Sequence, residues 1–257
     1  MKNILFLGYN SKKTKLINLL KKKNFSVSWT NKPLDIRSNL KIYDLIISFG
    51  YKHIINTKIL KKCKRPIINL HISYLPFNKG AHPNFWSFIE DTPSGVTIHE
   101  INNKIDTGNI IFQKFVNFDL YKNKSLTYKK TFEKLISEVE DLFLLNLNKI
   151  INKKYISYKQ NETGSFHTKN QLPKHFIKSW GQNILKVKNK YLNYMLKMKQ
   201  KRISLINQIE NTRKNNNVNW MNLLKIAIKS NPDETIKVLK KINTDDNKIS
   251  KLFKQIH

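Results

Sequence analysis

A chain of 257 residues has room for one domain of about 180 residues with an appendage, or for two small domains. Forty per cent of its residues are hydrophobic, enough for a real core, and its single cysteine excludes an internal disulfide and argues against a metal site. The net charge of +31 excludes little, because 44 of the 48 basic residues are lysines spread along the chain, whereas base reading and bidentate phosphate recognition rely mainly on arginine.

We therefore expect most of this charge to lie on solvated surfaces, where it would attract an anionic substrate. The N-terminal apolar run from Ile4 to Gly8 is too short for a signal peptide or a membrane span. No later segment approaches the apolar length that a membrane span needs. We expect a cytoplasmic protein with no membrane partner.

Strand and helix signals alternate over the first 151 residues. Apolar runs predict strands, and apolar residues at helical spacing predict helices. The predicted strands are 3–8, 43–50, 65–70, 95–101 and 109–115, and the predicted helices are 14–23 and 125–151. This order is typical of an α/β fold with a mostly parallel, Rossmann-like sheet covered on both faces. Ligands of such sheets bind beyond the carboxyl ends of the strands.

Strand signals stop after about residue 183, and the chain becomes helical. A long Lys-rich helix is predicted over 184–212, and a further apolar stripe follows over 219–229. Asn231 and Thr244 are then predicted to cap two more helices. We predict a domain over 1–183 and a helical module over 184–257. An amphipathic stripe must be covered by something, so dimerisation or partner docking is the expected role of the module.

Three polar side chains lie close to the most apolar strands. Asn69 and His71 are two apart at the end of a predicted strand, so both point to the same side. Their N–H groups could meet at one oxygen atom, as stabilisation of an oxyanion requires. Asp106 lies in an Asp-Thr-Gly turn and could accept a proton from an attacking amine. The pattern leaves a second interpretation open, since such residues also serve as loop caps and turn formers.

The motifs around these residues resemble the formyltransferase family that uses 10-formyltetrahydrofolate. The likeness is carried by "IINLHISYLPFNKGAHPNFW" over 67–86 and "GVTIHEINNKIDTGNIIFQ" over 95–113, with His71 and Asp106 35 positions apart. It extends over about residues 1–180, and includes "GSFH" at 164–167. It implies a formyltransferase fold, an enzyme, and the tetrahydrofolate derivative as formyl donor.

The resemblance also implies roles for particular residues. Asn69 and His71 would hold the oxyanion, and Asp106 would manage the protons. Two segments would form the walls of the folate pocket, represented here by Tyr51, Lys52, Ile54, Asn103 and Lys104. On the acceptor side, the expected contacts are Gly8, Asn10, His82, Asn84 and Trp86. The alternative for Phe85 and Trp86 is that they begin a helix and pack into the core.

Departures from the family patterns guide the choice of acceptor. The first loop, "GYNSKK", has the single glycine Gly8, whereas the purine-pathway transformylase has a Gly-rich loop that holds phosphate. A helical tail replaces the β-barrel domain usual in methionyl-tRNA formyltransferase. The segment "GAHPNFW" is more similar to the branch that formylates amino sugars, usually nucleotide-linked ones. We therefore expect a primary amine of such a sugar as acceptor.

Three alternatives stay open. The acceptor amine could be that of methionyl-tRNA or of glycinamide ribonucleotide. A third possibility, from another class of protein, is a basic nucleic-acid-binding protein built on a formyltransferase scaffold that has lost its chemistry. The lysine content keeps a nucleic-acid partner open, whereas the scarcity of arginine weighs against it.

Overall fold

The computed structural model describes residues 1–120, 122–160, 164–173 and 176–253. The chain divides into two compact units, Met1–Tyr191 and Leu192–His257, so the boundary falls inside a helix. The expected division between residues 183 and 184 stays a prediction. The side chains of Ile184, Val187 and Tyr191, at the start of that helix, are buried in the first unit.

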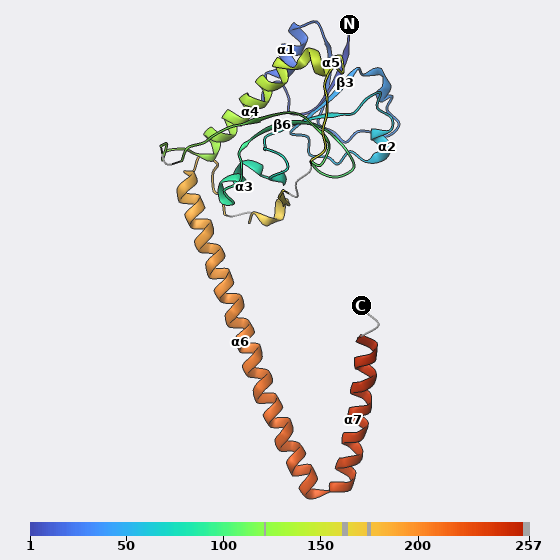
Figure 1. Ribbon diagram of the computed structural model, residues 1–257, viewed down its shortest axis with the longest axis vertical. Helices are drawn as coiled ribbons and strands as arrows, with labels where there is room; N and C mark the ends of the chain where they lie inside the picture. Colours follow the sequence, from blue (N-terminus) through green and yellow to red (C-terminus); the bar gives the residue numbers. More distant parts are fainter. Residues whose placement is uncertain (121, 161–163, 174–175, 254–257) are drawn as a thin grey trace. The chain divides into compact units, whose positions relative to one another are not determined.

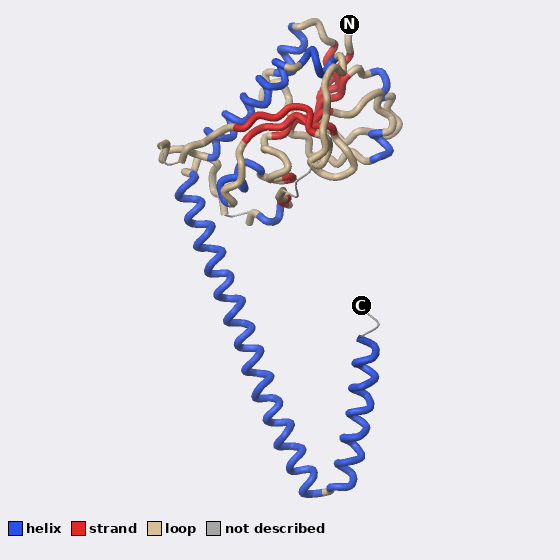
Figure 2. The backbone as a smooth tube through the Cα atoms, viewed as in Figure 1, coloured by secondary structure: helices blue, strands red, loops and turns tan. Residues whose placement is uncertain are grey.

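A six-stranded sheet forms the centre of the first unit (Figures 1 and 2). Four strands pair in parallel in the order β2-β1-β3-β4, and β6 and β7 extend the sheet in antiparallel pairing. The mostly parallel sheet expected from the sequence is confirmed, with its last two strands reversed. The strands are β1 (Asn3–Gly8), β2 (Ser26–Thr30), β3 (Leu45–Phe49), β4 (Ile68–His71), β6 (Gly95–Glu100) and β7 (Ile110–Phe115).

Strand β2 was not among the predicted strands. Its sequence, SVSWT, contains three hydroxyl residues, and none of its five side chains is buried, because it forms one edge of the sheet. An edge strand has less need of a continuous apolar run than the central strands do. By contrast, every residue of β3 is buried, and its apolar run identifies it in the sequence.

Helices cover both faces of the sheet. On one face lie α1 (Leu16–Lys22), α4 (Tyr128–Leu145) and α5 (Leu147–Ile151), which share a core with Phe6, Ile47 and Ile98. The other face is covered by η1 (Leu40–Ile42) and α2 (Thr57–Leu60). The single helix expected over 125–151 is interrupted at Asn146, whose side chain donates a hydrogen bond to the Leu142 carbonyl at 2.9 Å.

A second, two-stranded sheet lies beside the carboxyl end of β4. It pairs β5 (Lys79–Gly80) with β8 (Phe166–His167) in parallel. The segment "GSFH" singled out in the sequence thus contains β8, which pairs with the part of the loop after β4 that forms β5. Helix α3 (Pro83–Ile89) continues that loop, and η2 (Lys169–Gln171) follows β8.

The described residues of the second unit are helical, except for Asn231. Helix α6 runs from Ile184 to Ser230 without the break expected after residue 212, and α7 runs from Pro232 to Phe253. Asn231 caps α7 as predicted, because its side chain accepts from the Glu234 amide at 3.4 Å. Thr244 does not begin a new helix. Its hydroxyl donates back to the Lys240 carbonyl at 2.8 Å inside α7, and the rest of that predicted helix, 254–256, lies outside the described residues.

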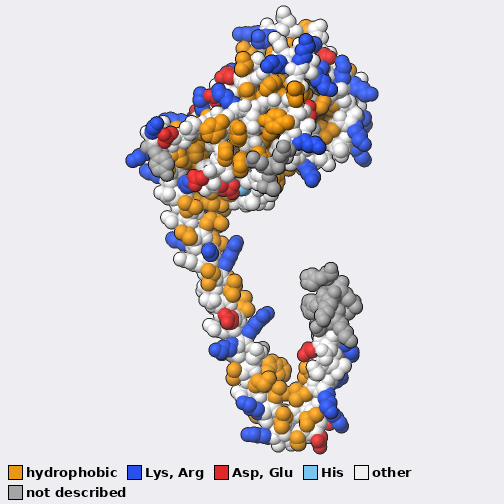
Figure 3. Space-filling view, in the orientation of Figure 1, with side chains coloured by type: hydrophobic (Ala, Val, Ile, Leu, Met, Phe, Trp, Pro, Cys, Tyr) orange, Lys and Arg blue, Asp and Glu red, His pale blue; other side chains and the backbone are white. Residues whose placement is uncertain are grey.

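Lysine and arginine side chains are scattered over the face of the first unit seen in Figure 3, interrupted by apolar and neutral groups. Scattering of this kind agrees with charge carried on solvated surfaces. Among the helices that the structure describes, none has the length and apolar character needed to cross a membrane.

Candidate active site

The three predicted catalytic residues meet at the carboxyl end of β4. Asn69 and His71 both lie on β4, and strand β6 runs beside them in antiparallel register, with His99 opposite Asn69. Asp106 follows β6 in the connection to β7, and its carboxylate turns back towards β4. The Asn69 Nδ2 lies 3.4 Å from Asp106 Oδ1, and the His71 Nε2 lies 3.6 Å from Asp106 Oδ2.

A buried histidine that the sequence analysis did not single out completes the cluster. His99 Nδ1 lies 2.8 Å from the Glu100 carbonyl oxygen, which can only accept, so Nδ1 carries the proton of the neutral ring. His99 Nε2 is then the acceptor of the 3.0 Å hydrogen bond from Asn69 Nδ2. This bond fixes the orientation of the Asn69 amide. Period-two alternation in "GVTIHEI" was the signal that could have placed His99 on the Asn69 side of the sheet.

The Asp-Thr-Gly turn has its shape because of two backbone constraints. Asp106 has a φ of +51°, in the left-handed region that Asp tolerates better than most residues. At Gly108, an added Cβ would overlap the Glu100 carbonyl oxygen, so only glycine fits. The Gly80 amide donates to Asp106 Oδ2 at 2.9 Å, and so holds the second carboxylate oxygen.

Burial and hydrogen bonding set the charge state of the cluster. Burial raises the pKa of Asp106, but the adjacent rings of His71 and His99 and the Gly80 amide outweigh it and hold that pKa well below its ordinary value. Burial lowers the pKa of His71, against the opposing effect of Asp106. At neutral pH the cluster therefore contains an ionised carboxylate beside a neutral imidazole. His71 Nε2 is buried and has no hydrogen-bond partner within the described part of the chain.

Gly108→Ala is expected to destabilise the protein by about 1–3 kcal/mol, because the new methyl group must displace either the turn or the Glu100 carbonyl. Thermal unfolding would measure the loss. Gly181→Ala is the matched control, since a Cβ there meets only the Ser179 hydroxyl at 3.4 Å. Equal melting temperatures for the Gly108 variant and wild type would contradict the close packing of this turn.

A cavity of about 180 Å³ opens beside the cluster. All five residues expected to contact folate lie in its lining, together with Asn69, His99 and Asp106. They come from two segments far apart in sequence, 51–55 after β3 and 101–106 after β6. The structure thus brings Tyr51, Lys52, Ile54, Asn103 and Lys104 together at one place next to the three polar residues. Their contact with a donor stays a prediction.

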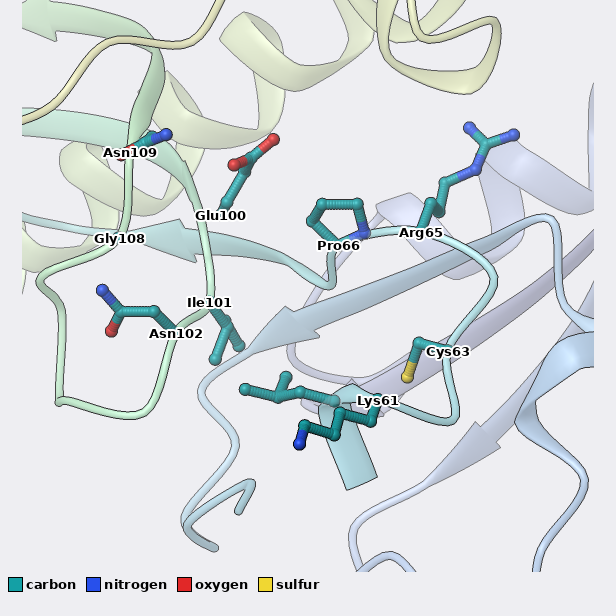
Figure 4. Close-up of a pocket in the computed structure, with 10 residues that line it drawn as sticks. Lys61, Cys63, Arg65, Pro66, Glu100, Ile101, Asn102, Gly108 and Asn109 are labelled. Atoms are coloured by element: carbon teal, nitrogen blue, oxygen red, sulfur yellow. The ribbon is translucent and has the colours of Figure 1, made fainter. Parts of the chain in front are cut away.

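A second cavity, of about 440 Å³, lies behind the 101–102 segment (Figure 4). It shares Ile101 and Asn102 with the first cavity, and its other lining residues are Leu60, Lys61, Cys63, Arg65, Pro66, Glu100, Gly108 and Asn109. None of Asn69, His71 and Asp106 lines it. This cavity is therefore adjacent to the cluster but not part of it.

The residues expected on the acceptor side do not all lie together in one cavity, unlike those expected to contact folate. Gly8 ends β1 with a φ of +103°, and its backbone packs against Phe49 and Tyr51. The Asn10 side chain caps its own turn by accepting from the Lys12 amide at 3.1 Å. Neither residue lines the cavity beside the cluster. His82 is half-buried at the start of α3, with its ring 5.6 Å from that of Trp180.

Asn84 and Trp86 lie in the core, and their expected contact with the acceptor stays a prediction. They are only 6% and 4% exposed. Asn84 donates to the Tyr128 carbonyl at 3.0 Å, and the Trp86 ring stacks on His167 at 4.2 Å. Helix α3 is short and covered on nearly all sides, so its polar and aromatic side chains pack inwards. Phe85, the other residue of the core-packing alternative, is buried as well.

Comparison with known proteins identifies relatives of the first unit. A family model described as "Formyl transferase" matches residues 5–139, which is 135 of the 257 residues. Among solved structures, the chain is similar to the formyltransferase PseJ from Anoxybacillus kamchatkensis, in complex with UDP-4,6-dideoxy-4-formamido-L-AltNAc and tetrahydrofolate. The TM-score is 0.66 with 38% identity, over 72% of this chain and 97% of that one.

Curated relatives are matched over shorter stretches. The chain is 31% identical over 88 residues to the dTDP-4-amino-4,6-dideoxyglucose formyltransferase of Mycobacterium tuberculosis, covering 34% of this chain and 37% of that protein. It is 31% identical over 153 residues to the methionyl-tRNA formyltransferase of Prochlorococcus marinus, covering 57% of this chain and 46% of that protein. The chain thus spans less than half the length of either relative.

Proposed function

The chain belongs to the formyl transferase family, and on that premise we propose that it transfers a formyl group from 10-formyltetrahydrofolate to a primary amine of a nucleotide-linked amino sugar. The observation that carries the proposal is the cluster of Asn69, His71 and Asp106, of which Asn69 and Asp106 line the adjoining cavity. An ionised carboxylate and an unpartnered imidazole nitrogen within 3.6 Å form a site for proton transfer and for binding a carbonyl oxygen.

The proposed chemistry assigns one task to each side chain. Asp106 accepts a proton from the attacking amine, because its carboxylate is ionised and held by the Gly80 amide. His71 would donate to the oxygen that becomes negative as the amine bonds to the formyl carbon, so the proposal places the proton of the neutral ring on Nε2, which has no partner among the described residues. Asn69 contributes its amide, whose 3.4 Å contact with Asp106 is long for a hydrogen bond and can be exchanged for a ligand oxygen.

The cavity beside the cluster supports folate as the donor. When bound, the donor would supply the formyl carbon. The bond from that carbon to the folate nitrogen would break as the oxyanion collapses, and the proton that Asp106 took from the amine would pass to that nitrogen. Segments 51–55 and 101–106 present mixed polar and apolar groups to the cavity, which suits a flat heterocycle with several hydrogen-bonding atoms. Asn69 and Asp106 lie in the same lining, so the donor and the cluster would share one space.

Two findings support a nucleotide-linked sugar as acceptor. PseJ, with 38% identity over 97% of its length, is described in complex with a UDP-linked formamido sugar and tetrahydrofolate. The excess of lysines favours a ligand that carries a diphosphate. Gly8 is the only glycine of its loop, which leaves fewer backbone amides free to approach the phosphate of glycinamide ribonucleotide.

The test is incubation of the purified chain with 10-formyltetrahydrofolate and a panel of UDP- and dTDP-linked amino sugars. We expect the mass of one formyl group to be added to at least one sugar, and none to be added to the same sugars with the amine acetylated. Methionyl-tRNA and glycinamide ribonucleotide are included as rival acceptors. Formylation of either rival without any sugar product would replace the proposal, and no formylation at all would contradict it.

Nucleic-acid binding is the rival from another class of protein. It predicts an affinity for RNA or DNA that falls steeply as salt is added, since each neutralised phosphate releases a counterion. A mobility-shift titration at two salt concentrations would detect it. The cytoplasmic location and the role of the helical module, including dimerisation through it, stay predictions.

A further inference from the structure

We propose that Gln160 is a positioning residue for Asp106, an inference that rests on the proposed function. Gln160 lies 54 residues after Asp106 in the chain, yet its Nε2 donates to the Asp106 carbonyl oxygen at 3.0 Å. The same nitrogen donates to the Gly108 carbonyl oxygen at 2.8 Å. One side-chain amide therefore ties both ends of the Asp-Thr-Gly turn together.

The orientation of this amide is fixed by its partners. Both acceptors are carbonyl oxygens, so the side chain must present its NH₂ group to the turn. The Gln160 Oε1 is then left buried, without a hydrogen-bond partner among the described residues. A buried acceptor without a donor is unfavourable. Part of the stability gained from the two donated bonds is thereby lost, so the main effect of the side chain is on the conformation of the turn.

The hydrogen bonds from Gln160 stabilise a turn whose backbone conformation is otherwise unfavourable. Asp106 holds a left-handed conformation, which is less stable than the right-handed one for any residue other than glycine. On the other side, Thr107 donates to the Asn102 side chain at 2.9 Å. The carbonyls of Asp106 and Gly108 face Gln160 instead. Without Gln160, two carbonyls lose their donor and the peptide that carries Asp106 is free to rotate.

Rotation of that peptide would move the carboxylate from its present partners. The titratable groups that face Asp106 are His71 on β4 and His99 on β6, each with Nε2 at 3.6 Å, and the Gly80 amide is at 2.9 Å. A longer Gly80 contact would raise the pKa of Asp106 towards its ordinary value. Displacement of a reacting group by about 1 Å can lower the rate about 10²-fold.

Gln160→Met keeps the length of the side chain and removes both donors. We expect kcat to fall by about 10- to 100-fold, while KM for the sugar and the donor stays near wild type. The acid limb of the kcat profile should move to higher pH, because Asp106 becomes easier to protonate. Gln160→Glu serves as a second variant, since its carboxylate repels the same two carbonyls at neutral pH and should impair kcat at least as much.

Gln113→Met is the matched control, because Gln113 Nε2 also donates twice, to the Leu75 carbonyl at 2.6 Å and to the Thr97 hydroxyl at 3.0 Å. We expect a lower melting temperature for this control and a pH profile like that of wild type. Carbon-13 NMR titration of the Asp106 carboxyl gives a readout independent of turnover, with a raised pKa expected only in the Gln160 variants.

Two results are decisive. If the Gln160 variants melt earlier but keep the wild-type pH profile and the wild-type Asp106 titration, Gln160 is only a structural residue and the inference is overturned. If the wild-type chain transfers no formyl group, the proposed function fails. The NMR titration then still decides whether Gln160 positions the carboxylate.

Discussion

Replacing Asp106 by asparagine is expected to lower kcat for formyl transfer by about 10²–10⁴-fold. The substitution keeps the size of the side chain and one oxygen for the Gly80 amide at 2.9 Å, but it removes the group that accepts the amine proton. KM should change little, because the geometry of the cavity lining is kept. The rate of formamide production, followed by mass spectrometry, measures the effect.

Asp35→Asn is the control for this variant, since it removes the same charge from an exposed pair with Arg37 at 3.1 Å. We expect wild-type turnover from it. A kcat for Asp106→Asn within about tenfold of wild type would show that another group takes the proton, because loss of a general base costs at least about 10²-fold.

The same substitution should change how stability depends on pH. The pKa of Asp106 is lowered in the folded protein, so this carboxylate contributes stability above its unfolded pKa of about 3.9, and the contribution is lost as the pH falls towards the folded value. The unfolding free energy of Asp106→Asn should therefore decline less steeply below about pH 4 than that of wild type. Urea denaturation at several pH values measures this.

Replacing His71 by alanine is expected to lower kcat for formyl transfer by about 10²–10³-fold. The ring offers the one buried nitrogen beside Asp106 that has no partner among the described residues, and the proposed function assigns it to the oxyanion. Steady-state kinetics with saturating donor separates the loss in kcat from any change in KM.

His167→Ala is the matched control for burial. His167 is as deeply buried as His71 and also lies beside a carboxylate, with Nε2 at 3.2 Å from Glu90 Oε2. Its loss removes the stacking on Trp86 and should lower the melting temperature, while kcat stays within about tenfold of wild type. Equal effects of the two substitutions on kcat would contradict a chemical role for His71.

The pKa of His71 adds a test by pH. Burial lowers that pKa, so the ring is neutral in the folded protein, whereas in the unfolded chain it takes up a proton near pH 6.5. Unfolding is then favoured as the pH falls below about 6.5, and the loss continues down to the folded pKa. His71→Ala should flatten the fall in stability between about pH 6.5 and 5.

Much of the fold follows from local sequence. The apolar runs of β1 and β3 predicted buried strands, and both form, with β1 at the predicted bounds of 3–8. The direction of β6 and β7 could not be read from their residues, because antiparallel and parallel strands share the same side-chain alternation. The continuity of α6 through 213–218 was also missed. Helix propagation does not require an apolar residue in every turn.

For the site, the sequence by itself determined which groups are present and which of them share a face of a strand. Asn69 and His71 are two apart on β4, and because side chains alternate along a strand, the two must lie on the same face. Only the tertiary structure decided what surrounds Asp106. Its neighbours Gly80 and Gln160 are 26 and 54 residues away in the chain. Gly80 is held near Asp106 because β5 pairs with β8, and Gln160 reaches Asp106 through its side chain. Contacts of that length depend on the order of the strands and on the paths of the loops, which no local pattern encodes.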